Sequence, residues 1–244
     1  MKARIKFRKY GALRFIGHLD VMRFFQKVMR RADIPIAFTG GYSPHMIMSF
    51  ASPLGIGLSS DGEYFDIELS APINSGEAVR RMNEACVEGV EVVSFRQIPE
   101  EKKMTGMTIL AAADYLVQPK NSSGFLPEDW TARFETFLAQ SRIRIVKQTK
   151  RSEKEVDIRP MIYNWEIRGN AVFMQLAAGS AQNLKPDLVM EAFCRYLDPG
   201  LDGQKTDFSS EAFQYHRMEM YADAGTVTER KLITLESLGT EIAE

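Results

Sequence analysis

The sequence predicts an α+β protein built from two tandem βαββαβ units with antiparallel sheets. Segments that alternate apolar and charged residues, as strands do, are separated by segments in which apolar residues recur at helical spacing. The order of these segments in residues 1–103 recurs in residues 104–222. A chain of 244 residues with 45% hydrophobic and 26% charged content is also able to bury a core.

The first unit is predicted from local patterns. Residues 2–9 alternate, and Met22, Phe25 and Met29 recur at helical spacing, so a helix should begin near His18. Asn74, with Glu77 three residues later, is a capping signal for the second helix. The four expected strands span residues 2–9, 45–51, 63–69 and 90–98. This order is the ferredoxin-like pattern, which places both helices on one face of the sheet and leaves the other face open.

The second unit is predicted in the same way, after a charged linker at residues 99–103. Trp130, Phe134 and Phe137 mark an amphipathic helix, and Pro186 suits the first turn of another. The expected elements are strands at 113–119, 143–149, 156–162, 171–177 and 212–221, and helices at 128–141 and 186–197. Residues 223–244 are expected to form an acidic tail, so the expected division is 1–103, 104–222 and 223–244.

Positive charge is concentrated at the start of the chain. The first thirty-one residues carry ten Lys or Arg against one acid, Asp20, although the whole chain has a net charge of −1. Alternation in a strand places Lys2, Arg4, Lys6 and Arg8 on one face. Such a field attracts polyanions, and we predict an RNA-contacting surface. Its phosphate contacts would be Arg4, Lys6, Arg8, Arg14, Arg23, Lys27, Arg30 and Arg31. The alternative is an ordinary solvated strand edge protected by lysine.

Three further features belong to this hypothesis. The glycine-rich loop of residues 40–45 would shape the site with Tyr42, Ser43 and His45, or would simply be a tight connection. Arg142 and Arg144 alternate with apolar residues and would extend the surface into a groove if the two units pack side by side; the alternative is solvated surface. For the nearby aromatics we expect core packing, with base stacking as the alternative: Tyr10, Phe15, Tyr42 and Phe50.

The sequence offers little for catalysis. Three scattered histidines and two remote cysteines give no zinc or iron–sulfur spacing, so we expect neither a metal nor a cofactor. His18, beside Asp20 in the basic region, is the one candidate general acid or base for RNA cleavage. A structural role is the alternative for His18. With neither a secretory signal nor an apolar run of membrane-helix length in the sequence, we expect a cytoplasmic protein that does not enter a membrane.

Several motifs in one order carry a resemblance over residues 1 to about 220. They are Arg14-Phe15-Ile16-Gly17-His18-Leu19-Asp20, Arg30-Arg31-Ala32-Asp33-Ile34-Pro35, Gly41-Tyr42-Ser43-Pro44-His45, Ser49-Phe50-Ala51-Ser52-Pro53-Leu54, the segment from Gly57 to Glu63, Val156-Asp157-Ile158-Arg159-Pro160 and Asn183-Leu184-Lys185-Pro186. On these motifs the chain resembles the radical-SAM-linked bacterial family of unknown function. The resemblance implies a cobalamin-binding radical SAM protein as a partner, and often a gene setting of ribosomal-protein and ribonuclease genes. Gly17 stands where that family usually has Ser. The duplicated βαββαβ pattern also resembles the RNA-binding fold of CRISPR repeat-processing proteins.

The resulting hypothesis is a non-catalytic, cytoplasmic RNA-binding accessory protein that presents tRNA or rRNA to a radical SAM or RNA-processing partner. One alternative is a metal-independent endoribonuclease that uses His18. The other is a protein-docking module for a radical SAM enzyme, whose basic face would meet an acidic partner.

Overall fold

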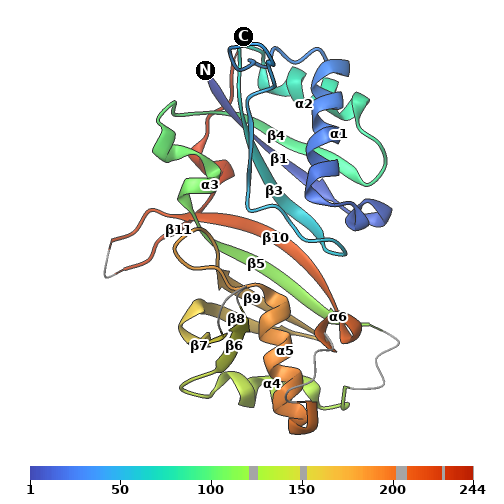
Figure 1. The fold of residues 1–244 in the computed structure, drawn as a ribbon, viewed down its shortest axis with the longest axis vertical. Coiled ribbons are helices and arrows are strands. Elements are labelled where there is room, and N and C mark those ends of the chain that lie inside the picture. Colours follow the sequence, from blue (N-terminus) through green and yellow to red (C-terminus); the bar gives the residue numbers. More distant parts are fainter. Residues whose placement is uncertain (121–125, 149–152, 202–207, 227–228, 244) are drawn as a thin grey trace. The chain divides into compact units, whose positions relative to one another are not determined.

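The structure is a computed structural model that describes residues 1–120, 126–148, 153–201, 208–226 and 229–243 (Figure 1). The chain forms two compact units: unit 1 comprises Met1–Ala112 and Arg217–Glu244, and unit 2 comprises Ala113–His216. Helices and mostly antiparallel strands occur in both, so the predicted α+β class is confirmed. The division differs from the expected one because the end of the chain returns to unit 1.

Unit 1 contains a sheet with the strand order β4-β1-β3-β10, in which β2 also pairs with β3, and β11 with β10. Strand β1 is antiparallel to both of its neighbours. The elements are β1 (Lys2–Lys9), α1 (His18–Arg31), β2 (Met48–Ala51), β3 (Ser59–Glu68), α2 (Ser75–Ala85), β4 (Val90–Ile98), α3 (Gly106–Ile109), β10 (Phe213–Asp223) and β11 (Leu232–Thr234), with 3-10 turns at Gly11–Phe15, Lys102–Met104 and Glu236–Leu238.

Local chemistry explains where the helices of unit 1 begin and end. The Asn74 side chain accepts a hydrogen bond of 3.0 Å from the backbone N–H of Glu77, so the predicted cap of α2 is confirmed. Helix α1 ends at Arg31, shortly before Pro35, and Asp33 has a φ of 50°. Gly89, with a φ of 97°, turns the chain into β4, and a side chain there would meet the carbonyl oxygen of Tyr10.

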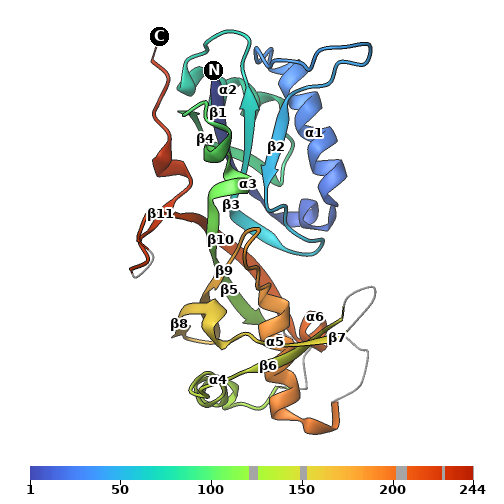
Figure 2. The same cartoon turned by 60° about the vertical axis from the view of Figure 1, so that its left-hand side comes forward.

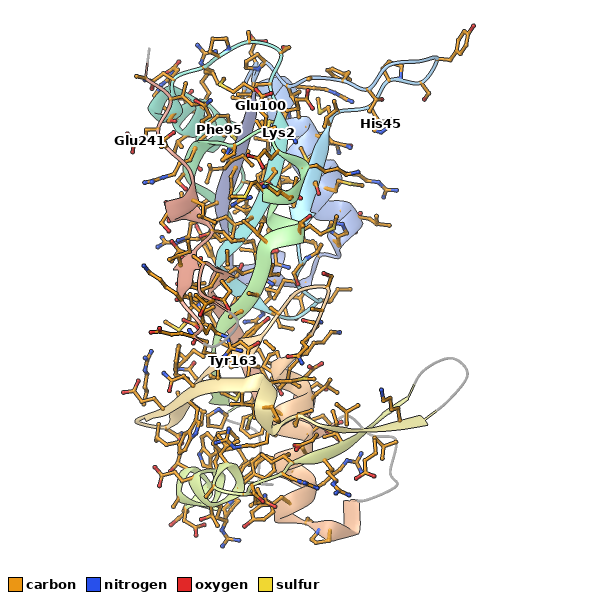
Figure 3. All side chains as sticks on the ribbon, turned by 90° about the vertical axis from the view of Figure 1, so that its left-hand side faces the viewer. Lys2, His45, Phe95, Glu100, Tyr163 and Glu241 are labelled. Atoms are coloured by element: carbon orange, nitrogen blue, oxygen red, sulfur yellow. The ribbon has the colours of Figure 1, made fainter. Side chains whose placement is uncertain are left out.

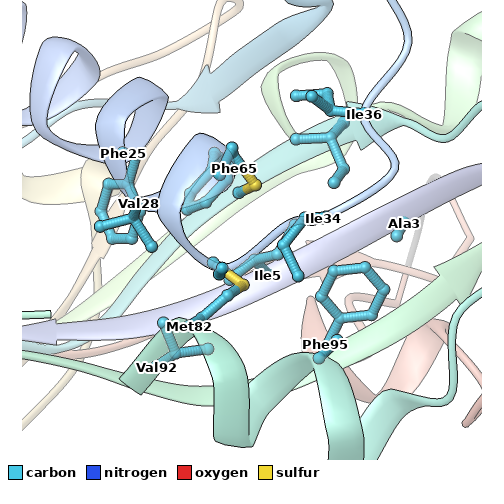
Figure 4. Close-up of a cluster of buried hydrophobic side chains, with 14 of the residues drawn as sticks. Ala3, Ile5, Phe25, Val28, Ile34, Ile36, Phe65, Met82, Val92 and Phe95 are labelled. Carbon is cyan, nitrogen blue, oxygen red and sulfur yellow. The ribbon is translucent and has the colours of Figure 1, made fainter. Parts of the chain in front are cut away.

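Helices α1 and α2 cover the same face of the sheet (Figure 1). The apolar side chains of β1, β3 and β4 meet those of both helices there, as Figure 4 shows for Ile5, Phe25, Phe65, Met82 and Val92. The ring centroids of Phe25 and Phe65 are 4.6 Å apart. Because apolar burial stabilises in proportion to area, this face is the core of unit 1.

The opposite face of the sheet is not open, contrary to the prediction. Arg4 donates to the carbonyl oxygen of Leu235 at 3.2 Å and to that of Met104 at 2.9 Å, so two later segments lie against β1. Leu235 is fully buried, and the backbones of Gln97 and Thr240 exchange two hydrogen bonds. Figure 2 shows the C-terminal segment after β11 running beside β4. Residues 232–242 of the expected acidic tail are therefore packed into unit 1.

Unit 2 contains the strand order β10-β5-β9-β8 and a separate β6-β7 hairpin. Its elements are β5 (Leu110–Pro119), α4 (Trp130–Leu138), β6 (Arg144–Gln148), β7 (Glu153–Asp157), β8 (Ile162–Arg168), β9 (Ala171–Ala177), α5 (Pro186–Leu197) and α6 (Phe208–Ala212), with 3-10 turns at Arg159–Met161 and Pro199–Leu201. Strands β5 and β10 each run through the boundary between the units. An aromatic core surrounds Phe193, whose ring centroid is 5.0 Å from that of Phe134.

The strand expected at 156–162 is wrong. Strand β7 ends at Asp157, whose carboxylate accepts hydrogen bonds of 3.0 Å from the N–H groups of Ile143 and Arg159. This Asp-centred turn, followed by Pro160, breaks the strand, and β8 starts only at Ile162. Within the described ranges, no helix is both long and apolar enough to cross a membrane.

Candidate functional site

Arg4 is enclosed in unit 1. Its side chain is 2% exposed and makes a two-point ion pair with Asp66, with Nε to Oδ1 at 2.8 Å and Nη2 to Oδ2 at 3.0 Å. Asp66 also accepts a hydrogen bond of 2.7 Å from the N–H of Gly106. In this fold Arg4 is not available to a phosphate, because every side of its guanidinium is engaged within the protein.

Lys6 is held by two carboxylates. Its Nζ lies 2.7 Å from Glu219 Oε2 and 3.0 Å from Glu236 Oε2, and Tyr64 donates to Glu219 Oε1 at 2.6 Å. Burial works against the charge of Lys6, but the hydrogen bonds and charges of Glu219 and Glu236 raise its pKa above the ordinary value. The expectation of an open cationic strand face is therefore corrected at Lys6 as well.

Arg8 and Lys9 complete the row at the end of β1. Arg8 is half-exposed and lies 3.4 Å from Asp61 Oδ1 and 3.3 Å from Glu91 Oε2. Lys9 is almost fully buried, with its Nζ 3.9 Å from Glu63 Oε1. Arg4, Lys6, Arg8 and Lys9 thus each lie next to a carboxylate of this same chain, and Lys2 donates to the backbone carbonyl of Glu100.

Lys9 belongs to a buried charge cluster that the sequence did not reveal. Glu63 also lies 3.4 Å from Nη2 of the buried Arg217 and accepts a hydrogen bond of 3.0 Å from Ser60. Arg217 donates from Nη1 to the carbonyl oxygen of Ser52 at 2.8 Å. Burial lowers the pKa of Lys9, Glu63 opposes this shift and Arg217 adds to it. Two buried cations thus share one carboxylate.

Helix α1 carries the cations that remain exposed. Arg23, Lys27, Arg30 and Arg31 lie on its outer side, which we call the α1 stripe, while Val21, Phe25, Val28 and Met29 are buried on the inner side. Arg23 approaches Asp20 at 3.4 Å, and both of these side chains are about two-thirds exposed. Lys27, Arg30 and Arg31 have no ion-pair partner among the described residues. The stripe is therefore a largely uncompensated positive surface.

A hairpin of residues 38–46 follows the C-terminal end of α1 (Figure 2). Phe38 pairs with Met46, and the N–H of Thr39 donates to the carbonyl oxygen of His45 at 2.9 Å. Figure 3 shows that the segment bearing His45 projects away from the sheet. Tyr42 is fully exposed, and Ser43 and His45 are exposed too. The three residues predicted from this loop are thus together at the surface.

The N-terminal end of α1 carries a second exposed aromatic. Phe15 is 58% exposed, and the guanidinium carbon of Arg14 lies 4.7 Å from its ring centroid. Phe50 is buried, as expected, but Phe15, Tyr42 and the partly exposed Tyr10 contradict the expectation of core packing. Their amphipathic surroundings in the sequence resemble those of core residues, so periodicity does not distinguish them.

His18, the candidate acid or base, is the first residue of α1. Its ring lies edge-on to Phe50 with the centroids 5.2 Å apart, and its Nδ1 is buried with no hydrogen-bond partner among the described residues. A catalytic histidine is normally oriented by a carboxylate or carbonyl on its second nitrogen, and His18 has no such group on Nδ1. Its surroundings fit packing better than proton transfer.

Arg142 and Arg144 lie on the β6-β7 region of unit 2. Arg144 donates to Glu155 Oε1 at 2.9 Å, and both side chains are 56% exposed. The N–H groups of Ile143 and Arg159, followed by the charges of Arg142 and Arg144, lower the pKa of Asp157. This hairpin carries charges of both signs. Its continuity with the cations of unit 1 stays a prediction.

Two further features of the described residues bear on chemistry. A hollow of about 520 Å³ lies between the C-terminal ends of α1 and α2, lined by Arg31, Asp33, Arg81, Glu84, Cys86 and Val87 among others. Burial raises the pKa of the Cys86 thiol to about 11, so this thiol is a poor nucleophile at neutral pH.

In the part of the chain that the structure describes, no group of three or more His, Cys, Asp or Glu side chains is placed to hold a metal ion.

Comparison with known proteins places the chain in a family. No curated protein matches it. A family model does match residues 2–186, which run from β1 to the first residue of α5 and include the α1 stripe and the 38–46 hairpin. The match covers well over half of the chain. The protein therefore belongs to the bacterial family described as "Uncharacterized protein conserved in bacteria (DUF2344)".

Proposed function

We propose that this protein is a non-catalytic RNA-binding protein that holds the phosphate backbone on the α1 stripe. The observation that supports this most is the set of exposed cations on one helix face, of which Lys27, Arg30 and Arg31 have no carboxylate partner among the described residues. An ordinary solvated helix mixes charges of both signs on its outer face. The stripe has one exposed acid beside it, Asp20 next to Arg23, and such a predominantly positive face attracts a polyanion.

The proposed phosphate contacts lie on α1 and on the turn before it rather than on β1. Arg4, Lys6 and Arg8 are paired with acids of the same chain, so the phosphate-binding set becomes Arg14, Arg23, Lys27, Arg30 and Arg31. Tyr42, Ser43 and His45 belong to the hairpin that follows α1 in the chain, and all three are exposed. Cations in the last turn of a helix also stabilise it through the macrodipole. That effect accounts for Arg30 and Arg31 but not for Arg23 and Lys27, which lie earlier in α1.

The finer parts of the hypothesis have separate support. In unit 1, the β4-β1-β3 order with β2 beside β3 and both helices on one face favours a ferredoxin-like unit. The role as an accessory that presents tRNA or rRNA to a radical SAM or RNA-processing partner rests on the family resemblance. The lack of an orienting group on His18 Nδ1 favours binding over cleavage.

The test uses two variants of equal net charge. In the stripe variant, Lys27, Arg30 and Arg31 are replaced by Ala; in the control, Lys103, Arg133 and Arg168, exposed cations that each have an acidic partner, are replaced by Ala. Binding of labelled bulk tRNA and of an rRNA fragment is measured from low to high salt. Each lost phosphate contact lowers the slope of log affinity against log salt by about 0.7 to 0.9, so the stripe variant should lose roughly 2 to 3 from the slope.

The control variant should retain the wild-type slope, because the three cations that it lacks form local ion pairs in the wild-type protein, and such exposed pairs contribute little net energy. Wild-type protein that binds neither RNA in a salt-dependent way would overturn the proposal. A control variant that loses as much as the stripe variant would overturn it too, since binding would then depend on net charge alone.

A further inference from the structure

Two exposed aromatic side chains flank helix α1 along the chain. Phe15 lies three residues before His18, the first residue of α1, and Tyr42 is on the hairpin of residues 38–46, which follows α1 in the chain. Both rings are far more exposed than large aromatic side chains usually are, and neither takes part in the core of unit 1. Exposing an aromatic ring forfeits the stability of burying it, and exposed apolar side chains of this kind are typical of a binding surface.

Phe15 lies beside a cation. The Arg14 guanidinium lies over the ring, and Leu19 and Ile56 are exposed as well. Ile56 is held near Arg14 because the N–H of Gly57 donates to the carbonyl oxygen of Arg14 at 2.8 Å. A planar guanidinium next to an exposed aromatic ring is the kind of surface on which unpaired bases stack.

Tyr42 is presented differently. Two hydrogen bonds close the base of its hairpin: Thr39 N–H to the carbonyl of His45, and His45 N–H to Thr39 Oγ1 at 3.1 Å. Gly41, with a φ of 101°, makes the turn that precedes Tyr42. The ring therefore stands at the tip of a closed hairpin and is free on both faces.

The two exposed aromatics favour one strand of nucleic acid over a duplex. Along the chain the residues of the α1 stripe lie between the two aromatics, and the 14 residues of α1 span about 21 Å at 1.5 Å per residue. In a duplex the bases are stacked inside the helix and present only their edges, so a duplex would engage the cations and leave Phe15 and Tyr42 unused. A single strand engages both.

We infer that the RNA bound at the α1 stripe is single-stranded, with unpaired bases stacked on Phe15 and on Tyr42. This inference rests on the proposed function and goes further by naming the class of RNA. Stacking on aromatic rings tolerates any base, so the site discriminates unpaired from paired RNA more than one sequence from another.

The experiment compares a labelled single-stranded RNA of mixed sequence, about 20 nucleotides long, with the blunt duplex of the same sequence. Stacking is worth about 1–3 kcal/mol per base, so Phe15→Ala and Tyr42→Ala should each weaken single-strand binding roughly 5- to 150-fold. The salt slope should not change, because no phosphate contact is lost. Tyr42→Phe should bind like wild type, since the ring remains. Met107→Ala, which removes an exposed apolar side chain in α3, is the matched control.

The possible failures are distinguishable. If the duplex binds as tightly as the single strand, or if Phe15→Ala and Tyr42→Ala both bind like wild type while the stripe variant loses affinity, the inference is wrong and the proposed RNA binding stands. If neither RNA binds the wild-type protein in a salt-dependent way, the proposed function fails and this inference fails with it. The far-UV and near-UV circular dichroism of each variant checks that the fold is retained.

Discussion

Arg4 on β1 and Asp66 on β3 form a fully buried ion pair in which both oxygens of the carboxylate accept hydrogen bonds from the guanidinium. The pair sits opposite the apolar core and holds three backbone groups besides: the carbonyls of Leu235 and Met104 and the N–H of Gly106. It therefore joins β1 and β3 to two segments that come much later in the chain.

Breaking this pair should be costly. Asp66→Ala leaves the Arg4 charge buried without a counter-charge, and we expect a loss of about 3–5 kcal/mol in the free energy of unfolding. The measurement is urea unfolding followed by circular dichroism. Arg168→Ala, which removes an exposed pair with Glu166, should change stability by no more than about 1 kcal/mol. Equal losses in the two variants would contradict the structural role of the buried pair.

The cluster of Lys9, Glu63 and Arg217 predicts an unequal response to substitution. Glu63→Gln leaves two buried cations without compensation and should cost about 3–5 kcal/mol. Lys9→Met leaves a balanced Glu63 and Arg217 pair and should cost far less, or stabilise the protein. Chemical unfolding at neutral pH measures which of the two variants loses more stability. A larger loss in Lys9→Met than in Glu63→Gln would show that Lys9, rather than Arg217, is the essential partner of Glu63.

Lys9 should also make the free energy of unfolding depend on pH. Burial lowers the pKa of Lys9 in the folded protein below the ordinary value of 10.5. Between these two pKa values the unfolded chain binds more protons than the folded one, so the contribution of Lys9 to stability rises with pH in that window. The difference in unfolding free energy between wild type and Lys9→Met should therefore shift in favour of wild type as the pH approaches 10.5. A flat difference across the window would contradict this.

The contribution of Glu236 to the stability of the protein should depend on pH in the acidic range. Burial acts to raise its pKa, but hydrogen bonds from Lys6 and Ser94 and the nearby cations hold the pKa below 4.5. Its contribution is thus fully present above 4.5 and is lost as the pH falls through the lowered folded value. Wild type and Glu236→Gln should differ in stability above 4.5 and converge at lower pH. Because Glu236 anchors the segment of residues 232–243, amide exchange at Thr240 should also be faster in the variant at neutral pH.

A substitution at Gly62 tests how closely β3 and β10 approach each other. A side chain at this position would come within 2.8 Å of the carbonyl oxygen of Met218 and 2.9 Å of the Cα of Glu219. Backbone has little room to move, so Gly62→Ala should destabilise the protein by about 1–3 kcal/mol. Gly40→Ala is the control, because a methyl group there meets nothing within 4 Å. Thermal unfolding of both proteins gives the comparison, and equal midpoints would argue against the close approach of β10.

Much of unit 1 follows from local sequence. The alternation of residues 2–9, the apolar spacing around Phe25 and the capping by Asn74 act between residues that are close in the chain, and each of these elements is confirmed. Near position 157 the local signal failed, because the Asp157 side chain, rather than the strand periodicity, determines where the strand ends.

The candidate site was only partly predictable, and the reason lies in distance along the chain. Alternation correctly places Arg4 and Lys6 on one face, but it carries no information about what covers that face. Asp66, Glu219 and Glu236 reach these cations only because β3, β10 and the C-terminal segment fold against β1. The exposure of Phe15 and Tyr42 is likewise a property of the packed surface rather than of any local pattern.

The amino-acid order by itself determined elements such as β1, α1 and α2, and which side of each is charged, because both depend on contacts between near neighbours in the chain. Only the tertiary structure decided which charges are used within the protein and which are left for a partner. That choice depends on where distant carboxylates lie. Next to Arg4, Lys6, Arg8 and Lys9 they are close enough to neutralise the charge, whereas among the described residues Lys27, Arg30 and Arg31 have no carboxylate within ion-pair distance.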